Sequence, residues 1–233
     1  MSPDQAPLRV ALNHGNFVLV GRDDAGRPKG ISVDLAQAYA AARGREIVFV
    51  EYERAVDVSS SATDDEWDIC FLAVDPERAM TIAFTEPYVR IEGNYLAGPD
   101  CDAPDAGALV ASGLPVGSVR GSAYSLTLQR KPGAEVLKLY ETLQLALQAL
   151  DRGEVRAAAG IRQAMEHEGG KRPGSRVLTP PFMEIRQAMA MPQGRPEASA
   201  DLQAFLTEAL RDGTVGDILE RHGVSRDCAI VPA

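Results

Sequence analysis

The 233-residue sequence lacks the features that mark several large classes of protein. It has 3 His, 3 Cys and 1 Trp, and its His and Cys residues are too scattered to give the ligand spacing of a metal site. No apolar run approaches the roughly 20 residues that span a bilayer, and the N-terminal segment has no basic and then apolar secretory signal. We therefore expect no metal and no cofactor. The missing signal indicates either a cytoplasmic protein or a mature chain with an added methionine.

An excess of positive charge is also missing. Lys and Arg number 24 against 33 Asp and Glu, which gives a net charge of −9. Such a charge argues against nucleic acid and anionic membranes as partners, so any anionic ligand must be attracted by local arginines. The content of 45% hydrophobic and 24% charged residues is that of an ordinary globular protein, and the length suits one large domain or two small lobes. We expect a monomer.

The most informative stretch of the chain is residues 70–88. Residues 69–74 are a short apolar run, which is typical of a strand covered on both faces. Asp75 and Pro76 then form a helix-start signal, which predicts that Arg78 lies in the first turn of a short helix beyond the carboxyl end of the strand. Ligands of open α/β sheets bind at this edge, and the guanidinium fork suits a carboxylate. The alternative is an arginine in a surface ion pair.

The segments that precede this stretch predict a parallel sheet. A strand is expected at residues 8–12, a hairpin-like turn at 22–29, a helix from residue 30 to about 44, and a strand at 47–50. This order is a βαβ arrangement, whose two strands run parallel.

A second βα unit follows a run of Asp, Pro and Gly at residues 99–107. A strand at 115–119 leads to Ser122, which is a good N-cap for a helix at 123–130. With Arg120 beside it, the hydroxyl and the helix N-terminus form a candidate anion site. The alternative is a serine that only caps its helix.

The rest of the chain continues this alternation. Strands are expected at residues 155–160 and 182–191, and helices at 141–150 and 200–211. A capping box that begins at Thr214 predicts a last helix.

Residues 76–88, PERAMTIAFTEPY, resemble the T-x-x-R-x-x-x-x-x-F-S-x-P-Y signature of the solute-binding proteins of ABC transporters, specifically the family that binds polar amino acids. Weaker matches follow at residues 30–35 (G-F-D-V-D-L in the family), 153–157 (G-x-V-D-A) and 212–214 (D-G-T). In that family the arginine that matches Arg78 clamps the α-carboxylate of the ligand.

The resemblance implies an α/β, two-lobed periplasmic-binding-protein type II fold, in which each lobe is a mostly parallel sheet flanked by helices and two hinge strands join the lobes. Residues 1–97 plus 193–233 would form lobe 1, and residues 98–192 lobe 2. The implied function is to bind a small solute, by hinge closure and without catalysis, as the substrate-binding component of an ABC-type transporter. Membrane subunits of the transporter are then the expected partners, and the periplasm is the expected location.

The loop after the first strand is the second ligand contact that the resemblance implies. Its matching positions hold Asn13 and Asn16, with Phe17 adjacent. For the two asparagines a role in turns is the alternative. An apolar or aromatic ligand body would lie on Phe17 and Phe71.

The departures from the family pattern concern the ligand's ammonium group. Relatives hold it with an acidic residue of the second lobe and with polar groups on the strand before the arginine. The matching positions here are Ile161, Phe71 and Ala73, which offer no carboxylate or hydroxyl, whereas Arg162 and Arg120 add positive charge. Because an unpaired buried charge costs several kcal/mol, we expect a small carboxylate that lacks a free α-ammonium.

Two other functions remain open. Solute-binding folds have given rise to cyclohexadienyl dehydratases, for which His14 or Glu184 can be offered as the general acid. The third interpretation is a cytoplasmic ligand sensor, which the missing signal segment favours.

The three cysteines carry little information on function. Cys70 lies in the apolar run and is expected to be a buried thiol. Cys101 and Cys228 lie in polar segments and either pair or stay free.

Overall fold

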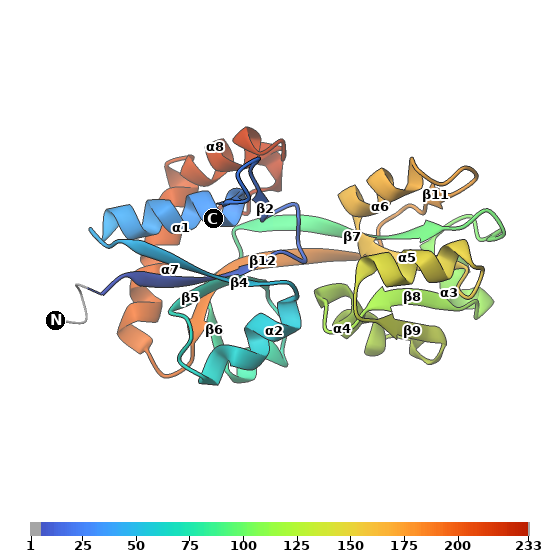
Figure 1. Ribbon diagram of the computed structural model, residues 1–233, viewed down its shortest axis with the longest axis horizontal. Helices are drawn as coiled ribbons and strands as arrows, with labels where there is room; N and C mark the ends of the chain where they lie inside the picture. The colour runs from blue at the N-terminus through green and yellow to red at the C-terminus, as the bar shows by residue number, and fades with distance from the viewer. Residues whose placement is uncertain (1–5, 233) are drawn as a thin grey trace. The chain divides into compact units, whose positions relative to one another are not determined.

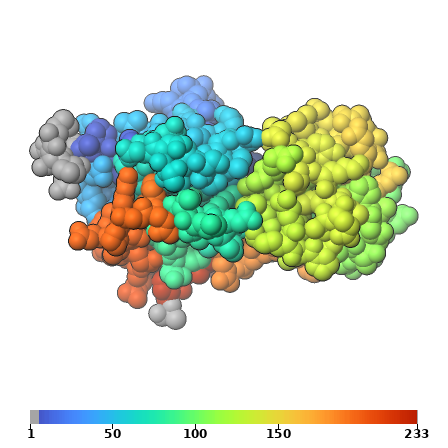
Figure 2. Space-filling view, turned by 90° about the horizontal axis from the view of Figure 1, so that it is seen from below, coloured from blue at the N-terminus to red at the C-terminus, as the bar shows by residue number. Residues whose placement is uncertain are grey.

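The computed structural model describes residues 6–232, which form two compact units (Figure 1). Unit 1 takes the chain up to Arg90 and again from Arg186, and unit 2 is Ile91–Ile185. Figure 2 shows this division in colour, because unit 1 combines blue and cyan with deep orange and red while unit 2 runs from green through yellow to light orange. The chain passes from unit 1 to unit 2 within strand β7 (Val89–Ala97) and returns to unit 1 within strand β12 (Met183–Pro192). The expected lobe boundaries, after residues 97 and 192, lie at the far ends of these two strands.

Unit 1 contains a sheet in the order β4, β1, β5, β12, in which β4, β1 and β5 run parallel and β12 runs antiparallel to β5. Its other strands are those of a small hairpin, β2 and β3, and β6, which pairs with β12. The strands are β1 (Leu8–Asn13), β2 (Gly21–Arg22), β3 (Pro28–Lys29), β4 (Ile47–Tyr52), β5 (Ile69–Ala73) and β6 (Ile82–Phe84). The helices are α1 (Ile31–Ala42), α2 (Ala55–Ser60), α7 (Pro196–Arg211) and α8 (Thr214–Arg221).

Helices cover both faces of this sheet. Side chains of β5 alternate between the faces, as the two-residue period of a strand requires: Ile69 and Phe71 join the cluster that includes α1, α7 and α8, while Cys70 and Leu72 join the cluster on the α2 side (Figure 1). The expected strand with two buried faces is therefore confirmed. Cys70 is a buried thiol, as predicted, and all three cysteines are free.

One glycine fixes the path of the chain from the hairpin into α1. Gly30 has φ 129°, and a Cβ there would lie 2.5 Å from the carbonyl oxygen of Leu19. Only glycine adopts this conformation and leaves that space. The loop after β1 can therefore lie directly against the start of α1.

Unit 2 contains a sheet in the order β7, β10, β8, β9. The strands β10, β8 and β9 run parallel, β7 runs antiparallel to β10, and β11 pairs with β7. The strands are β8 (Val116–Val119), β9 (Leu137–Tyr140), β10 (Ala157–Ile161) and β11 (Arg176–Val177). The helices are α3 (Ala106–Ser112), α4 (Ala123–Gln129), α5 (Leu143–Asp151) and α6 (Arg162–Gly169).

The short helix predicted after Asp75 and Pro76 is present as the 3-10 helix η3 (Arg78–Met80), and Arg78 lies in its first turn beyond the end of β5. The prediction for the start of the last helix is wrong. The capping box at Thr214 does not form, because Gly213 is the N-cap of α8 and the Thr214 N–H donates to Asp212 Oδ1 at 2.8 Å.

Candidate ligand-binding site

The candidate residues of unit 1 lie where the parallel strands of its sheet end. We call this side, at the C-terminal ends of the strands, the carboxyl edge of the sheet. Because β1 and β5 are parallel neighbours, with Val10 opposite Ile69, their last residues Asn13 and Ala73 end at the same edge. Arg78 follows five residues after Ala73, which places it at that edge together with the loop after β1. The structure thus brings together Arg78, Asn13 and Asn16, which the sequence singled out separately.

Arg78 is buried, with 4% of its surface exposed. Its Nη1 donates to the carbonyl oxygen of Ala73 at 3.1 Å, which ties the guanidinium to the end of β5. The turn that carries it is closed by Asp75, whose Oδ1 accepts from the Glu77 N–H at 2.9 Å and whose carbonyl oxygen accepts from the Ala79 N–H at 2.9 Å. Asp75 therefore does cap the turn as predicted, although the turn continues as a 3-10 helix.

The electrostatic setting of Arg78 is that of a cation withdrawn from water. Burial lowers the pKa of its guanidinium, and the negative charge of Asp75 opposes this shift. An arginine remains charged even so, because its ordinary pKa lies above 12. A buried guanidinium of this kind is stabilised by an anion that binds beside it.

The loop after β1 holds two buried asparagines and an exposed phenylalanine. Asn13 Oδ1 accepts from the Gly15 N–H at 3.1 Å, which is the turn role offered as its alternative. Asn16 is 6% exposed, and its Oδ1 has no hydrogen-bond partner among the described residues. The ring of Phe17 is 51% exposed and is open to an apolar ligand body.

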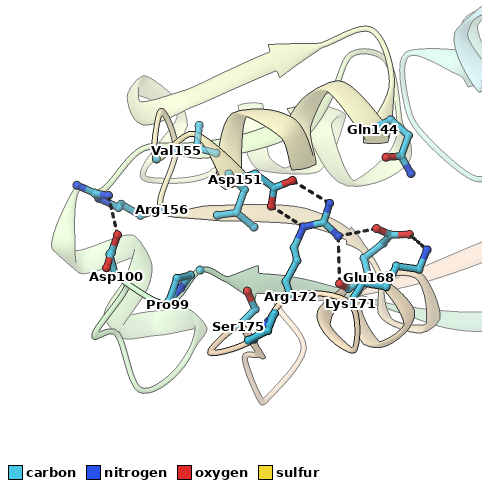
Figure 3. A pocket seen from close by; sticks show the side chains of 14 residues that line it. Pro99, Asp100, Gln144, Asp151, Val155, Arg156, Glu168, Lys171, Arg172 and Ser175 are labelled. Carbon is cyan, nitrogen blue, oxygen red and sulfur yellow. Dashed lines mark hydrogen bonds and ion pairs between the residues drawn. The ribbon is translucent and has the colours of Figure 1, made fainter.

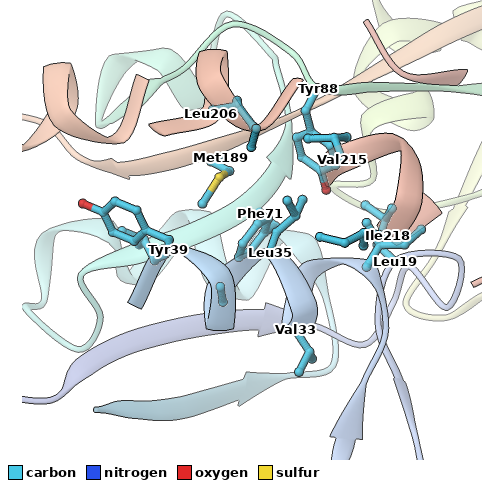
Figure 4. Close-up of a cluster of buried hydrophobic side chains, with 14 of the residues drawn as sticks. Leu19, Val33, Leu35, Tyr39, Phe71, Tyr88, Met189, Leu206, Val215 and Ile218 are labelled. Carbon is cyan, nitrogen blue, oxygen red and sulfur yellow. The ribbon is translucent and has the colours of Figure 1, made fainter. Parts of the chain in front are cut away.

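Phe71 is part of the hydrophobic core. It is 3% exposed and packs edge-on against Tyr88, with the ring centroids 6.3 Å apart, in the cluster that also contains Leu35 and Met189 (Figure 4). A side chain in this position faces the helices α1, α7 and α8. We therefore leave Phe71 out of the ligand contacts and retain Ala73, whose carbonyl oxygen orients Arg78.

The candidate residues of unit 2 lie at the carboxyl edge of its own sheet. Ser122 caps α4: its Oγ accepts from the Ser125 N–H at 3.1 Å and donates to the Val119 carbonyl oxygen at 2.8 Å. Arg120 is half-exposed, and its Nε lies 2.9 Å from Glu141 Oε1. The capping role of Ser122 is thus observed, and Arg120 already has a carboxylate partner.

Arg162 lies at the same edge, because β10 runs parallel to β8 and Arg162 follows its last residue. Its half-exposed side chain is held by two carboxylates, with Nη1 2.6 Å from Glu92 Oε2 and Nε 2.8 Å from Glu166 Oε1. These two bonds raise the pKa of Arg162. The positive charge that the sequence predicted here is more than balanced by its neighbours.

A pocket of about 570 Å³ also lies in unit 2, at the opposite edge of the sheet (Figure 3). Val155 and Arg156, which line it, precede β10, whereas Arg162 follows that strand. At its centre the guanidinium of Arg172 contacts Asp151 Oδ1 at 2.7 Å and Glu168 Oε2 at 2.6 Å. Because these contacts join α5 to α6, we regard the central ion pairs as structural.

The site contains residues that sequence reasoning missed. Gln187 on β12 is buried and lies opposite Ala73 in register, at the end of β5 where Arg78 is anchored. The expected strand at residues 182–191 also contains Glu184 and Arg186, so nothing in the sequence singled out Gln187. The pairing of Glu166 with Arg162 was readable from their i,i+4 spacing, but that of Glu92 was not. Within residues 6–232 no three His, Cys, Asp or Glu side chains are placed to hold a metal ion.

Comparison with known families decides the class of the protein. The profile of the bacterial extracellular solute-binding proteins, family 3, matches residues 8–225. The chain belongs to this family. The resemblance seen in residues 76–88 is thereby confirmed, and with it the assignment as a solute-binding protein of the periplasmic-binding-protein type II class.

Solved structures of this class share the fold. A mutant of ArgBP from T. maritima is 19% identical with a TM-score of 0.78, and the match covers 94% of this chain and 95% of that one. ArtJ, the arginine-, lysine-, histidine-binding protein from Geobacillus stearothermophilus, is 18% identical with a TM-score of 0.74, over 92% and 94% of the two chains. A histidine kinase sensor domain with similarity to periplasmic binding proteins is 20% identical with a TM-score of 0.82, over 98% and 99%. A search of curated protein sequences gives no match.

These likenesses confirm the fold class: the family 3 chain has the α/β, type II periplasmic-binding-protein fold. The family description supports the binding of a small solute as the activity. None of the helices within residues 6–232 has the length and apolar character of a membrane span.

Proposed function

We propose that this family 3 protein binds a small organic acid through Arg78 and delivers it as the substrate-binding component of an ABC-type transporter. The observation that carries the proposal is the buried guanidinium at the carboxyl end of β5, 4% exposed and anchored by the Ala73 carbonyl oxygen. The guanidinium group has five donors in a fixed plane, one of them bonded to Ala73, and this geometry suits the two oxygens of a carboxylate. Its burial reduces the screening of the charge by solvent, which strengthens the attraction of an arriving anion.

The ligand contacts that we assign to unit 1 are Arg78, Ala73, Asn13 and Asn16, with Phe17 against an apolar body. Those of unit 2 are Ser122, Arg120 and Arg162. Asn16 Oδ1, which has no hydrogen-bond partner among the described residues, could accept from a donor that the ligand carries besides its carboxylate, such as a hydroxyl group. The exposed ring of Phe17 supports a hydrophobic portion.

The ligand should lack a free α-ammonium. The carboxylates at the unit 2 edge are engaged, Glu141 by Arg120 and Glu92 and Glu166 by Arg162. An ammonium bound there would have to displace an arginine from its carboxylate or remain unpaired. ArgBP and ArtJ, whose names state amino-acid ligands, are less than 25% identical to this chain and thus share the fold alone.

Calorimetry on matched ligand pairs tests this proposal. Phenylalanine with 3-phenylpropionate, and leucine with its keto acid, differ at the α-carbon but share the carboxylate and side chain. We expect the member without the ammonium to bind more tightly in each pair. Tight binding of an unmodified α-amino acid would contradict the proposal, and native mass spectrometry of the purified protein would show directly whether a small acid co-purifies.

A second candidate is an enzyme of the cyclohexadienyl-dehydratase type. The observation that favours it is a histidine and carboxylate pair, since His14 Nε2 lies 2.7 Å from Glu51 Oε2. An ancestral amino acid-binding protein, titled as a precursor of cyclohexadienyl dehydratase, shares the fold at 19% identity and a TM-score of 0.77. Glu51 is on β4, however, which lies on the other side of β1 from β5 and Arg78. Incubation with prephenate or arogenate, followed by an absorbance scan, separates the two functions.

A ligand sensor is the third candidate, and the likeness to a histidine kinase sensor domain over nearly the whole of both chains supports it. The transporter function predicts a periplasmic or extracellular location and genes for membrane subunits nearby. The sensor function predicts neighbouring signalling genes instead. The codons upstream of the gene and its neighbours distinguish these outcomes.

A further inference from the structure

Gln187 of unit 1 is a buried polar side chain without an internal hydrogen bond. The residue is 5% exposed, and its backbone carbonyl oxygen accepts from the Tyr88 N–H at 2.9 Å. Its carboxamide has no hydrogen-bond partner among residues 6–232, although the amide nitrogen and oxygen are not fully enclosed. Because buried polar side chains are normally paired, an unpaired one that still reaches solvent is a candidate ligand contact.

The register of the strands places this carboxamide beside the anchor of Arg78. Gln187 on β12 is directly opposite Ala73 on β5, and the Ala73 carbonyl oxygen accepts from Arg78 Nη1 at 3.1 Å. Residues opposite each other in an antiparallel pair have Cα atoms about 4.5–5.5 Å apart and side chains on the same face. The pair of Met189 and Phe71, two residues further in, packs on one face of the sheet (Figure 4), so Gln187 continues that face toward the carboxyl edge.

Unpaired side-chain amides therefore lie on both sides of the strand that anchors Arg78. β12 and β1 are the two neighbours of β5 in the sheet, and the loop after β1 supplies the buried Oδ1 of Asn16. Gln187, Arg78 and Asn16 all belong to unit 1. The carboxyl edge of this one unit thus combines a buried cation with two neutral hydrogen-bonding groups.

The chemistry of a carboxamide limits what Gln187 can recognise. A glutamine amide donates through Nε2 and accepts through Oε1, but it carries no charge. It can satisfy a hydroxyl or a keto oxygen, whereas the charge of an ammonium beside it would remain without a counter-ion. Asn16 Oδ1, as an acceptor, offers a further partner to a hydroxyl.

We infer that Gln187 determines specificity, by donating to an oxygen substituent on the α-carbon of the acid, so that the protein selects 2-hydroxy and 2-oxo acids. This inference rests on the proposed function, because it assigns the ligand carboxylate to Arg78. A carboxylate bound there holds its α-carbon near the end of β5, and Gln187 is the uncharged polar side chain opposite that end on the neighbouring strand.

Calorimetry on acids that differ only at the α-carbon tests the inference. One series is 3-phenyllactate, phenylpyruvate, 3-phenylpropionate and phenylalanine, and the other is lactate, pyruvate, propionate and alanine. We expect wild type to bind the hydroxy or keto acid of a series roughly tenfold more tightly than the unsubstituted acid, which is the effect of one net hydrogen bond. Gln187→Met keeps the unbranched shape but cannot donate, so it should reduce this preference to less than about twofold and leave the unsubstituted acid bound as before.

Gln187→Glu is a second variant, with the opposite expectation for the ammonium. A carboxylate at this position can pair with an ammonium, so the affinity for the α-amino acid, relative to the unsubstituted acid, should rise by about tenfold or more. A glutamine with a purely structural role would give no such gain.

The matched control is Gln37→Met, because Gln37 is an exposed glutamine on α1 of the same unit. Its ratios of affinity should stay within about twofold of those of wild type. Thermal denaturation of each variant establishes that it is folded before its binding is compared.

The outcomes separate this inference from the proposed function. Suppose that wild type binds acids of either series. The role of Gln187 is then overturned, while carboxylate binding stands, if wild type prefers the unsubstituted acid, if Gln187→Met keeps the preference, or if folded Gln187→Glu gains nothing for the amino acid. If wild type binds the α-amino acid most tightly, both proposals fall. If wild type binds no acid of either series, the proposed function fails and takes the inference with it.

Discussion

The arginines of the two units differ in their surroundings although the sequence proposes the same role for all three. Arg78 in unit 1 is 4% exposed and is oriented by a backbone carbonyl oxygen. Arg120 and Arg162 in unit 2 are about half-exposed, and each contacts carboxylates of its own unit. A buried guanidinium gains strongly from an arriving anion, whereas an exposed one, which solvent screens, gains little.

Under the proposed function, the two units contribute unequally to recognition. Unit 1 would supply the buried cation that binds the acid, whereas the two arginines of unit 2 already contact carboxylates. The capped N-terminus of α4 follows the same rule, because the hydroxyl of Ser122 is committed to Ser125 and Val119. Substitutions should therefore have large effects at the buried positions of unit 1 and small effects at the exposed positions of unit 2.

The largest effect on stability should come from Phe71→Ala. Removing a buried ring that packs against Tyr88 leaves a cavity in unit 1, and the free energy of unfolding should fall by about 3–5 kcal/mol. Phe17→Ala is the matched control, because its ring is exposed, and should change stability by less than about 0.5 kcal/mol. Denaturation in urea measures both. Equal losses would show that the loop after β1 is packed as tightly as the core.

Binding should separate Arg78→Lys from Arg120→Lys. Both variants keep the positive charge, but lysine cannot reproduce the planar fork of a bidentate contact. We expect the dissociation constant for the preferred acid to rise about 10- to 100-fold in Arg78→Lys, as one charge-assisted hydrogen bond is lost, and by less than about threefold in Arg120→Lys. Calorimetry gives both values; comparable losses would mean that Arg120 exchanges Glu141 for the ligand.

The partly buried carboxylate of Asp68 in unit 1 should contribute more to the pH dependence of the free energy of unfolding than the exposed carboxylate of Glu166 in unit 2. Burial alone would raise the pKa of Asp68. Hydrogen bonds from Arg9 outweigh this and lower the pKa, and a hydrogen bond from Arg195 lowers it further. Its stabilisation is therefore present above about pH 4, the ordinary pKa, and is lost as the pH falls through the lower folded value. Asp68→Asn should cost about 1–3 kcal/mol at pH 7 and flatten the loss of stability on acidification.

Urea denaturation between pH 7 and pH 2 provides the measurement for Asp68. Glu166→Gln is the control, since its pair with Arg162 is exposed, and its stability curve should follow that of wild type within about 0.5 kcal/mol. A larger change in Glu166→Gln than in Asp68→Asn would reverse the comparison.

The smallest effect should be that of Ser122→Ala. Loss of the cap leaves the Ser125 N–H without its acceptor and should lower the free energy of unfolding by about 1 kcal/mol. Binding should weaken by less than about threefold, because the hydroxyl already serves the helix. Thermal denaturation and calorimetry on the same sample separate the two roles, and a loss of binding without a loss of stability would show that the ligand contact of Ser122 outweighs its capping role.

The position of Arg78 was predictable because local signals determine it. An apolar run, an aspartate and a proline together end a strand and start a turn, and the structure has the turn at that point. The face on which Phe71 lies was not predictable, because in a strand buried on both sides the residues of either face are apolar. Its neighbour Cys70 faces the other layer, and nothing in the run distinguishes the two.

The sequence did not reveal interaction partners that lie far apart along the chain. The sequence predicted positive charge around Arg162, but Glu92 lies 70 residues away and meets it only because β7 pairs with β10. The unsatisfied Oδ1 of Asn16 and the place of Gln187 beside Ala73 depend in the same way on the packing of strands. Charge balance at a site is therefore a tertiary property, and the sequence positions of Arg120 and Arg162 alone overstated the cationic character of unit 2.

Calorimetry of wild type and Arg78→Ala with the acid that wild type binds most tightly tests the central claim most directly. Removing the guanidinium leaves the ligand carboxylate without its cation, and we predict a loss of about 2–5 kcal/mol in binding free energy with a folded variant. An unchanged dissociation constant in that folded variant would contradict the account, because the acid would then bind without the buried cation of unit 1.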